Sequence, residues 1–245
     1  MNTTGFGRTV LCAAMLFTGA AAQMQAHASV VISGTRVVYN AKESETTIKL
    51  TNEGKTPSLT QVWIDRGEVN DDPSLIDAPF TVSPPVSRID PGKAQTLRIV
   101  YTGEPLAEDK ELVFWLNVLD IPPKTSDGTE ANKLQLAFRS RIKLFFRPTG
   151  IQGSAVDAPD QIQWTLVPGG IEARNPTAYH VSFASIEVTA GGRNVKAETV
   201  GMVDPGASKV FTLSGELSGG AGKTVRFHAI NDYGGAHRNA MSLKQ

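Results

Sequence analysis

Alternation of apolar and polar side chains with a period of two runs through most of the chain and constrains its fold more than any other feature. Successive side chains of a strand point to opposite faces, so this period predicts β-strands. Amphipathic patterns of helical length are missing after residue 28. The candidate strands of the first half are residues 30–39, 46–52, 59–65, 80–84, 94–101, 112–120 and 134–146. Seven short strands in roughly 120 residues are typical of an immunoglobulin-like sandwich.

The segment from Arg147 to Gly150 marks a domain boundary. Pro148 has no N–H to give to a strand, and glycine follows two residues later. The strand pattern then resumes with more glycine, over residues 162–167, 170–175, 180–190, 209–215 and 224–232. We therefore expect an all-β chain with an N-terminal immunoglobulin-like domain at 29–148 and a smaller second one at 149–245.

The first 28 residues read as a secretory signal peptide. Arg8 precedes an apolar stretch over 10–22, and small residues at Ala26 and Ala28 form a cleavage site. We expect cleavage after Ala28, export, and no membrane anchor, because no stretch of about 18 uncharged apolar residues follows. Cys12, the only cysteine, could mark lipid attachment, but it lies at the start of the apolar stretch rather than its end. The exported chain therefore contains no disulfide.

Charge and motifs exclude several classes of function. The 24 basic and 24 acidic residues balance, which argues against binding to nucleic acid or a generally basic membrane-surface role. His180, His228 and His237 have no metal-ligand spacing, and surface or edge-strand positions are expected for them. A nucleophile elbow and a phosphate-binding glycine loop are missing from the sequence. We expect no enzyme activity, no metal and no cofactor.

The segment 133–148, KLQLAFRSRIKLFFRP, is the most informative one. Leu134, Leu136 and Phe138 share one face of a predicted strand. A long apolar strand with open backbone groups invites pairing with another chain. Periodicity alone favours the plainer interpretation, a central strand whose apolar face fills its own core.

Arg36 and Lys143 each lie in the middle of an apolar strand, where a charge is costly without a partner. Each could extend along the sheet to reach solvent, the usual outcome for a lone cation. If both pointed to one place, they would instead form an anchor for a carboxylate.

Motifs spread over residues 34–235 resemble the PapD-like periplasmic pilus chaperones. They are GTRVVY, QVWID, SPPVSRIDPG, FWLNVLDIPPK, LQLAFRSRIKLFFRP, EARNPTAYHV and AINDYGG, in this order. The resemblance implies two immunoglobulin-like domains set as a boomerang, which bind pilin subunits that lack a strand and deliver them to an outer-membrane usher. The chaperone lends its own strand to the subunit by β-augmentation.

The resemblance also implies residue roles. Leu134, Leu136 and Phe138 match the donor residues that enter the subunit's groove. Arg36 and Lys143 match the pair that grips the subunit's C-terminal carboxylate. A period of two places Lys143 and Leu134 on opposite faces, so we expect a bulge or strong twist between Phe138 and Lys143.

Further matches concern the domain junction and the surface. Glu111, Arg147 and Asp232 match an interdomain charge cluster; solvated surface charges are the plainer alternative. Pro57 matches a proline near the usher-recognition surface. The Ser83-Pro84 bond lies where the family often has a cis bond. The short loop at 122–133 indicates the branch that serves rod-forming pili.

Two other functions stay open on sequence grounds. A carbohydrate- or peptide-binding module would not need Arg36, Lys143 and the apolar triplet together. A hydrolase would need a nucleophile and base that no motif predicts. Without a subunit, a dimer that caps the exposed strand is physically reasonable.

Overall fold

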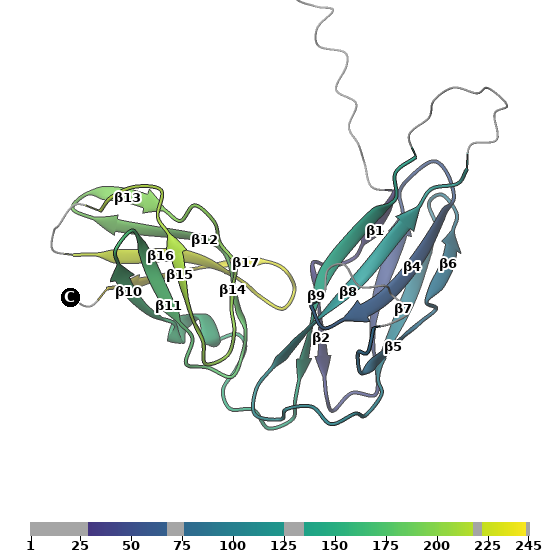
Figure 1. Cartoon of the computed structure of the whole chain (residues 1–245), viewed down its shortest axis with the longest axis horizontal. Coiled ribbons are helices and arrows are strands. Elements are labelled where there is room, and N and C mark those ends of the chain that lie inside the picture. The colour runs from purple at the N-terminus through teal and green to yellow at the C-terminus, as the bar shows by residue number, and fades with distance from the viewer. Residues whose placement is uncertain (1–28, 68–75, 125–134, 218–221, 244–245) are drawn as a thin grey trace, which may run out of the picture.

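The computed structural model describes residues 29–67, 76–124, 135–217 and 222–243. The predicted leader, residues 1–28, and Leu134 lie outside these ranges. The described chain forms two β-sandwiches joined at an angle, the N-terminal one on the right and the C-terminal one on the left of Figure 1. The chain is all-β with two immunoglobulin-like domains, as the sequence predicts.

The first sandwich contains two sheets. One has the order β1-β3-β7-β5 and the other β2-β9-β8-β4-β6. The strands of the first sheet are β1 (Val30–Ile32), β3 (Thr46–Asn52), β7 (Ala94–Tyr101) and β5 (Phe80–Ser83). Those of the second are β2 (Arg36–Asn40), β9 (Phe138–Arg147), β8 (Leu112–Ile121), β4 (Ser58–Asp65) and β6 (Val86–Ile89). The Ser83–Pro84 bond between β5 and β6 is cis.

The core of the first sandwich lies between these sheets. Leu50, Leu97, Leu116 and Leu144 are fully buried there, one from each of four strands. Aromatic side chains pack against one another at the end of this core near the second domain, where the Phe80 and Phe114 rings lie 4.8 Å apart in an edge arrangement. This packing contributes beyond the buried area alone.

The second sandwich is built the same way. A sheet of β10 (Gln163–Val167), β11 (Gly170–Arg174) and β15 (Ser208–Thr212) faces a sheet with the path β13-β12-β16-β17, to which β14 (Met202–Val203) adds on β12. The strands of that path are β13 (Arg193–Lys196), β12 (Val181–Ala190), β16 (Thr224–Ile230) and β17 (Ala236–Ser242). A 3-10 turn, η3 (Ala158–Gln161), precedes β10.

Two strand predictions need correction. The apolar run 30–39 is not one strand, because it breaks at Ser33–Thr35 and crosses from one sheet to the other. Of the predicted run 134–146, the structure describes residues 135–146, and within these the strand begins at Phe138. Strands β6, β13, β14 and β17 are not among the predicted strands, because their short or polar sequences carry little period-two signal.

Candidate functional site

Strand β9 has one edge that is only half paired. Strand β8 pairs with it from Phe138 to Phe146, on one side. On the other side β2 pairs with it in parallel, but only from Lys143, which lies opposite Arg36, to Arg147. In the part of the chain that the structure describes, no strand pairs with Phe138–Ile142 on that side, and we call this stretch the open edge. A further strand can add there.

The two ends of β9 have different surroundings. Leu144 and Phe146 are buried in the core, and Ile142 packs against it. Leu136 and Phe138 continue the same alternation, yet they are 52% and 44% exposed. The plainer interpretation of this segment therefore holds for the second half of β9, whose apolar side chains fill the domain's own core. The first half presents apolar side chains that this core does not use.

Of the bulge or strong twist predicted between Phe138 and Lys143, the bulge is wrong. The pairing of β9 with β8 runs without a register shift from Phe146 to Phe138, so Lys143 and Phe138 point to opposite faces. A bulge is unnecessary, because a strand added to the open edge lies in the plane of the sheet. Side chains of the added strand can contact the face of β9 that carries Phe138, while the main-chain end of that strand lies in the plane of the sheet, between the two faces.

Arg36 and Lys143 come together where β2 begins. They occupy paired positions of β2 and β9, and both are half-buried. Arg36 lies over the Phe145 ring at 5.6 Å, and Lys143 over the Trp115 ring at 5.7 Å. Arg36 Nη1 donates to the carbonyl oxygen of Ile230 at 3.1 Å. Among the described residues, no carboxylate forms an ion pair with either cation.

Burial makes both charges unfavourable. It lowers the pKa of Arg36, against which the more distant Asp232 and Glu111 act in the opposite direction. Burial also lowers the pKa of Lys143, and the like charges of Arg36 and Lys209 lower it further. Two half-buried cations side by side favour an anion between them, and a carboxylate matches the donors of a guanidinium and an ammonium.

The face of β9 opposite Phe138, which also carries Lys143, contacts a buried carboxylate that was not predicted from the sequence. Asp65, at the end of β4, is fully buried and forms ion pairs with Arg141 and, at 3.4 Å, with Arg139. Asn117 Nδ2 donates to Asp65 at 2.7 Å and its oxygen accepts from Arg139 at 2.8 Å. The polar residues that alternate along 139–143 are the sequence signal for this contact.

Two tryptophans complete that face. The Arg139 guanidinium lies 4.9 Å from the Trp63 ring centre, and that of Arg141 lies 4.4 Å from the Trp115 ring centre. Cation–π contacts of this kind add to the ion pairs. Together these contacts connect the first half of β9 to β8 and β4.

The three residues of the predicted charge cluster meet at the domain junction. Arg147 donates through Nε and Nη2 to Glu111, at 3.0 and 2.8 Å, and through Nη1 and Nη2 to Asp232 of the second domain, at 2.9 and 3.1 Å. Glu111 is 2% exposed. Burial opposes the charge of Arg147, but hydrogen bonds to Asp232 and the charge of Glu111 outweigh it, so its pKa is raised.

A histidine from the second domain joins this cluster. The backbone N–H of His180 donates to Glu111 at 3.0 Å, and its Nδ1 lies 2.9 Å from the same oxygen. The expectation of a surface or edge position is therefore wrong for His180, whose ring packs on Phe145. His228 lies in the interior strand β16 and contacts Ser185, whereas His237 lies on the edge strand β17. In the described ranges, no group of potential ligands is arranged for a metal.

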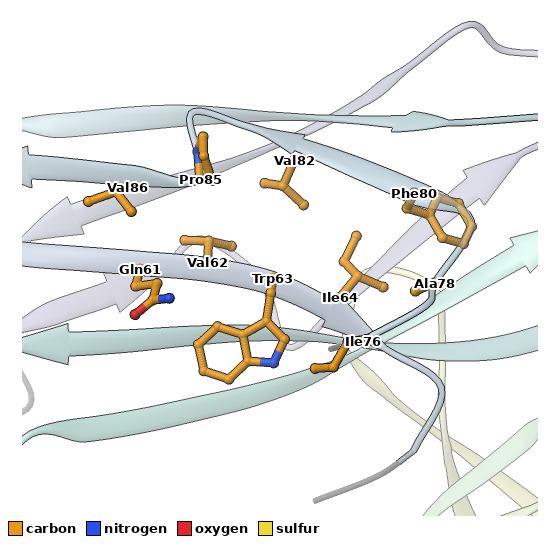
Figure 2. Close-up of a pocket in the computed structure, with 10 residues that line it drawn as sticks. All are labelled: Gln61, Val62, Trp63, Ile64, Ile76, Ala78, Phe80, Val82, Pro85 and Val86. Carbon is orange, nitrogen blue, oxygen red and sulfur yellow. The ribbon is translucent and has the colours of Figure 1, made fainter. Parts of the chain in front are cut away.

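Pro57 and a nearby crevice lie elsewhere on the first domain. Pro57 directly precedes β4 and is half-buried. Further along β4, a crevice of about 330 Å³ opens between the sheets, and Figure 2 shows its lining, which includes Trp63, Ile76 and Phe80. It contains none of the residues that the sequence analysis predicted for function. Across the described chain, no helix is long and apolar enough to cross a membrane.

Comparison with known proteins identifies the family. Residues 29–152 match the model of the PapD N-terminal domain of pili and flagellar-assembly chaperones, and 157–241 match that of the C-terminal domain of the pili assembly chaperone PapD. The chaperone protein FimB/FhaD of Bordetella pertussis is 44% identical over 94% of this chain and 93% of its own length.

Solved structures agree with these matches. The crystal structure of the YadV chaperone covers 88% of this chain and all of its own, with 38% identity and a TM-score of 0.75. The Salmonella enterica SafB chaperone, solved in complex with the SafA pilin, gives 29% identity and a TM-score of 0.74 over 89% of this chain and 98% of its own. This chain therefore belongs to the PapD-like family of pilus-assembly chaperones.

Proposed function

We propose that the chain is a periplasmic chaperone that binds pilin subunits by adding a strand of the subunit to the open edge of β9. The observation that carries this proposal is the open edge itself, which ends at the paired cations Arg36 and Lys143. The SafB chaperone, which was solved in complex with a pilin, supports a pilin subunit as the partner of this chain. Residues 1–28 act as the cleaved leader that directs export.

The direction of the added strand follows from the position of the cations. A strand added to the open edge lies beside Phe138–Ile142, on the side of β9 where β2 lies beside Lys143–Arg147. The added strand therefore ends where β2 begins, at Arg36. A strand parallel to β9 brings its C-terminal end to Arg36 and Lys143, whereas an antiparallel strand would bring its N-terminal end there. Because both groups are cations, the parallel strand with a terminal carboxylate is favoured.

The apolar side chains next to the open edge supply the rest of the binding energy. Leu136 and Phe138 are exposed and face one side, and we assign Leu134 to the same set. Burial of each in a subunit's groove contributes about 1.5 to 3 kcal/mol. The carboxylate anchor fixes the register, because a slip of one residue would turn these side chains to the other face.

The remaining predicted residues act away from the bound strand. We assign Glu111, Arg147 and Asp232 to holding the angle between the domains, on the basis of their hydrogen bonds across the junction. We assign Pro57, on the surface before β4, to the contact with the usher that receives the loaded chaperone. No cofactor or metal takes part in this scheme.

The anchor can be tested with peptides from the C-terminal strand of a subunit. Truncation of one partner of a desolvated charge pair costs about 2 to 5 kcal/mol, or roughly 30-fold to several thousand-fold in affinity. We expect this loss for Arg36→Ala, for Lys143→Ala and for an amidated peptide. Because both cations bind one carboxylate, the double variant should bind little worse than either single one. Isothermal titration calorimetry measures each affinity.

Arg88→Ala is the control for loss of a positive charge. Arg88 lies on the same sheet in β6, pairs with Asp90 and has an exposed side chain. The Arg88→Ala variant should bind the free-acid peptide and the amidated peptide with the same affinities as the wild type. Equal affinity of wild type for the free-acid and amidated peptides would exclude the carboxylate anchor.

A further inference from the structure

The loop between β16 and β17, residues 231–235, touches the first domain next to Arg36. A Cβ atom at Gly234 would lie 3.6 Å from the Thr35 Cβ and well inside van der Waals contact with the Thr35 Oγ1. Thr35 directly precedes Arg36. Ile230, the last residue of β16, accepts the hydrogen bond of Arg36 Nη1 at 3.1 Å. In Figure 1 this hairpin projects from the second domain toward the first.

The loop is braced from within. Asn231 Oδ1 accepts from the backbone N–H groups of Tyr233 and Gly235, at 3.1 and 2.9 Å, and the Asn231 N–H donates to the Gly235 carbonyl at 2.9 Å. Gly234 has a φ of +84°, a conformation that glycine adopts without strain. Asp232 is held by Arg147 in addition. A bulky group at Gly234 therefore cannot be accommodated by free movement of the loop.

The hydrogen bond to Ile230 restricts the Arg36 guanidinium. One of its five N–H donors points to this carbonyl, and the Phe145 ring lies on one side of its plane. Arg36 Nε is buried without a hydrogen-bond partner among the described residues. The orientation of the remaining donors is thus set by a main-chain group of the second domain, whose distance depends on how closely the two domains approach.

We propose that the 231–235 loop is the positioning element of the carboxylate anchor: Gly234 sets the spacing of the domains against Thr35, and the Ile230 carbonyl orients Arg36 for its ligand. This inference rests on the proposed function and adds the second domain to the binding of the subunit terminus. It accounts for a glycine at 234, since any side chain there would push the loop away from Thr35 and withdraw the Ile230 carbonyl.

Gly234→Ala and Gly192→Ala form a matched pair. Gly192 has a similar φ of +79°, but a Cβ there meets nothing within 4 Å. Both variants therefore carry the same backbone strain, and only the first separates the domains. We expect Gly234→Ala to bind the free-acid strand peptide at least about tenfold more weakly than Gly192→Ala, since it displaces one partner of a charge pair.

Two further variants make the steric cause explicit. Gly234→Leu, compared with Gly192→Leu, places a larger side chain against Thr35 and should lose more affinity than Gly234→Ala. Thr35→Ala removes Oγ1 and should restore most of the binding of Gly234→Ala, which a general loss of stability would not allow.

The spacing of the domains provides a readout independent of binding. After residue 28 the chain has no cysteine, so Lys49→Cys and Lys196→Cys, both exposed, introduce one spin label in each domain. The distance between the two labels, measured by pulsed electron paramagnetic resonance, should shift in Gly234→Ala and stay unchanged in Gly192→Ala. It should return to the wild-type value when Thr35→Ala is added to Gly234→Ala.

The outcomes separate this inference from the proposed function. If the Gly234 variants bind the free-acid peptide as tightly as their Gly192 counterparts and show the same label distance, the loop does not position Arg36. If wild type fails to distinguish the free-acid from the amidated peptide, the carboxylate anchor is wrong, and with it the role of the loop in binding. The label distance then still decides whether Gly234 sets the spacing.

Discussion

At the scale of single residues, the anchor stands in conflict with the stability of the free protein. Lys143 is half-buried beside Arg36 with no carboxylate partner among the described residues. Burial first, and then the neighbouring charges of Arg36 and Lys209, lower its pKa. A position kept in an unfavourable state is expected where the side chain waits for a ligand.

Replacement of Lys143 with methionine should therefore raise the free energy of unfolding of the free chaperone at neutral pH, while it removes the anchor. Methionine keeps the apolar contact with Trp115 and removes the desolvated charge. Urea unfolding of wild type and variant measures the difference. An Arg88→Met control, at an exposed charge, should leave stability nearly unchanged. A less stable Lys143→Met would show that the lysine stabilises the fold.

The same lowered pKa predicts a pH dependence with a definite sign. The unfolded chain keeps the ordinary lysine pKa, so between the lowered folded value and the ordinary one it binds more protons than the folded chain. Stability contributed by this site must then rise with pH through that window. Unfolding curves recorded from neutral to alkaline pH should show the wild type approach Lys143→Met. A constant difference would contradict this.

The sequence alone indicates these two cations but not the residues that surround them. Arg36 and Lys143 stand out because each interrupts an apolar strand, and family resemblance linked them. Asp65 itself carries no such signal, since it ends a strand like many solvated acids. The alternating polar residues at 139–143 indicate a polar contact but not its partner. Its contacts with Arg139 and Arg141 depend on the register between three strands, and a single sequence does not contain that register.

At the scale of elements, β9 combines two roles in one strand. Its second half is paired on both sides and fills the core, whereas its first half has an open edge and exposed apolar side chains. Periodicity predicted the strand but could not show where its core-facing side chains stop. The predicted bulge failed because a partner was assumed to contact β9 from one face only, while edge pairing lies in the plane of the sheet.

A glutamate in place of Leu136 should leave the fold intact and abolish subunit binding. Leu136 is 52% exposed, so little packing is lost in the free protein. In the complex the charge would enter an apolar groove, at a cost above the roughly 1.5 to 3 kcal/mol of lost leucine burial. Circular dichroism and co-purification with a pilin test the two parts.

Val210→Glu is the matched control, because Val210 is a strand residue of the second domain with 54% exposure. It should affect neither measurement. If Leu136→Glu unfolds the protein and Val210→Glu does not, Leu136 belongs to the chaperone's own core, and the plainer interpretation of the segment is correct.

At the scale of the whole molecule, the sequence predicted two sandwiches but not their junction. Strand patterns report which side chains face a core, and each domain has its own. The junction instead depends on single contacts between the ends of strands, such as His180 with Glu111 and Gly234 with Thr35. These residues carry no periodic signal, and only family resemblance pointed to Glu111, Arg147 and Asp232.

The charge cluster at this junction should be the most sensitive ion-pair network between the domains. Arg147→Met leaves the Glu111 carboxylate buried, with His180 as its remaining partner among the described contacts. Removal of one partner from a buried pair costs about 3 to 5 kcal/mol. Arg98→Met, which breaks the exposed pair with Glu45, should cost at most about 1 kcal/mol. Differential scanning calorimetry compares the two.

Because Glu111→Gln removes the unpaired charge, the double variant with Arg147→Met should recover much of the loss. Equal and small effects of Arg147→Met and Arg98→Met would mean that packing, rather than this cluster, holds the two domains together.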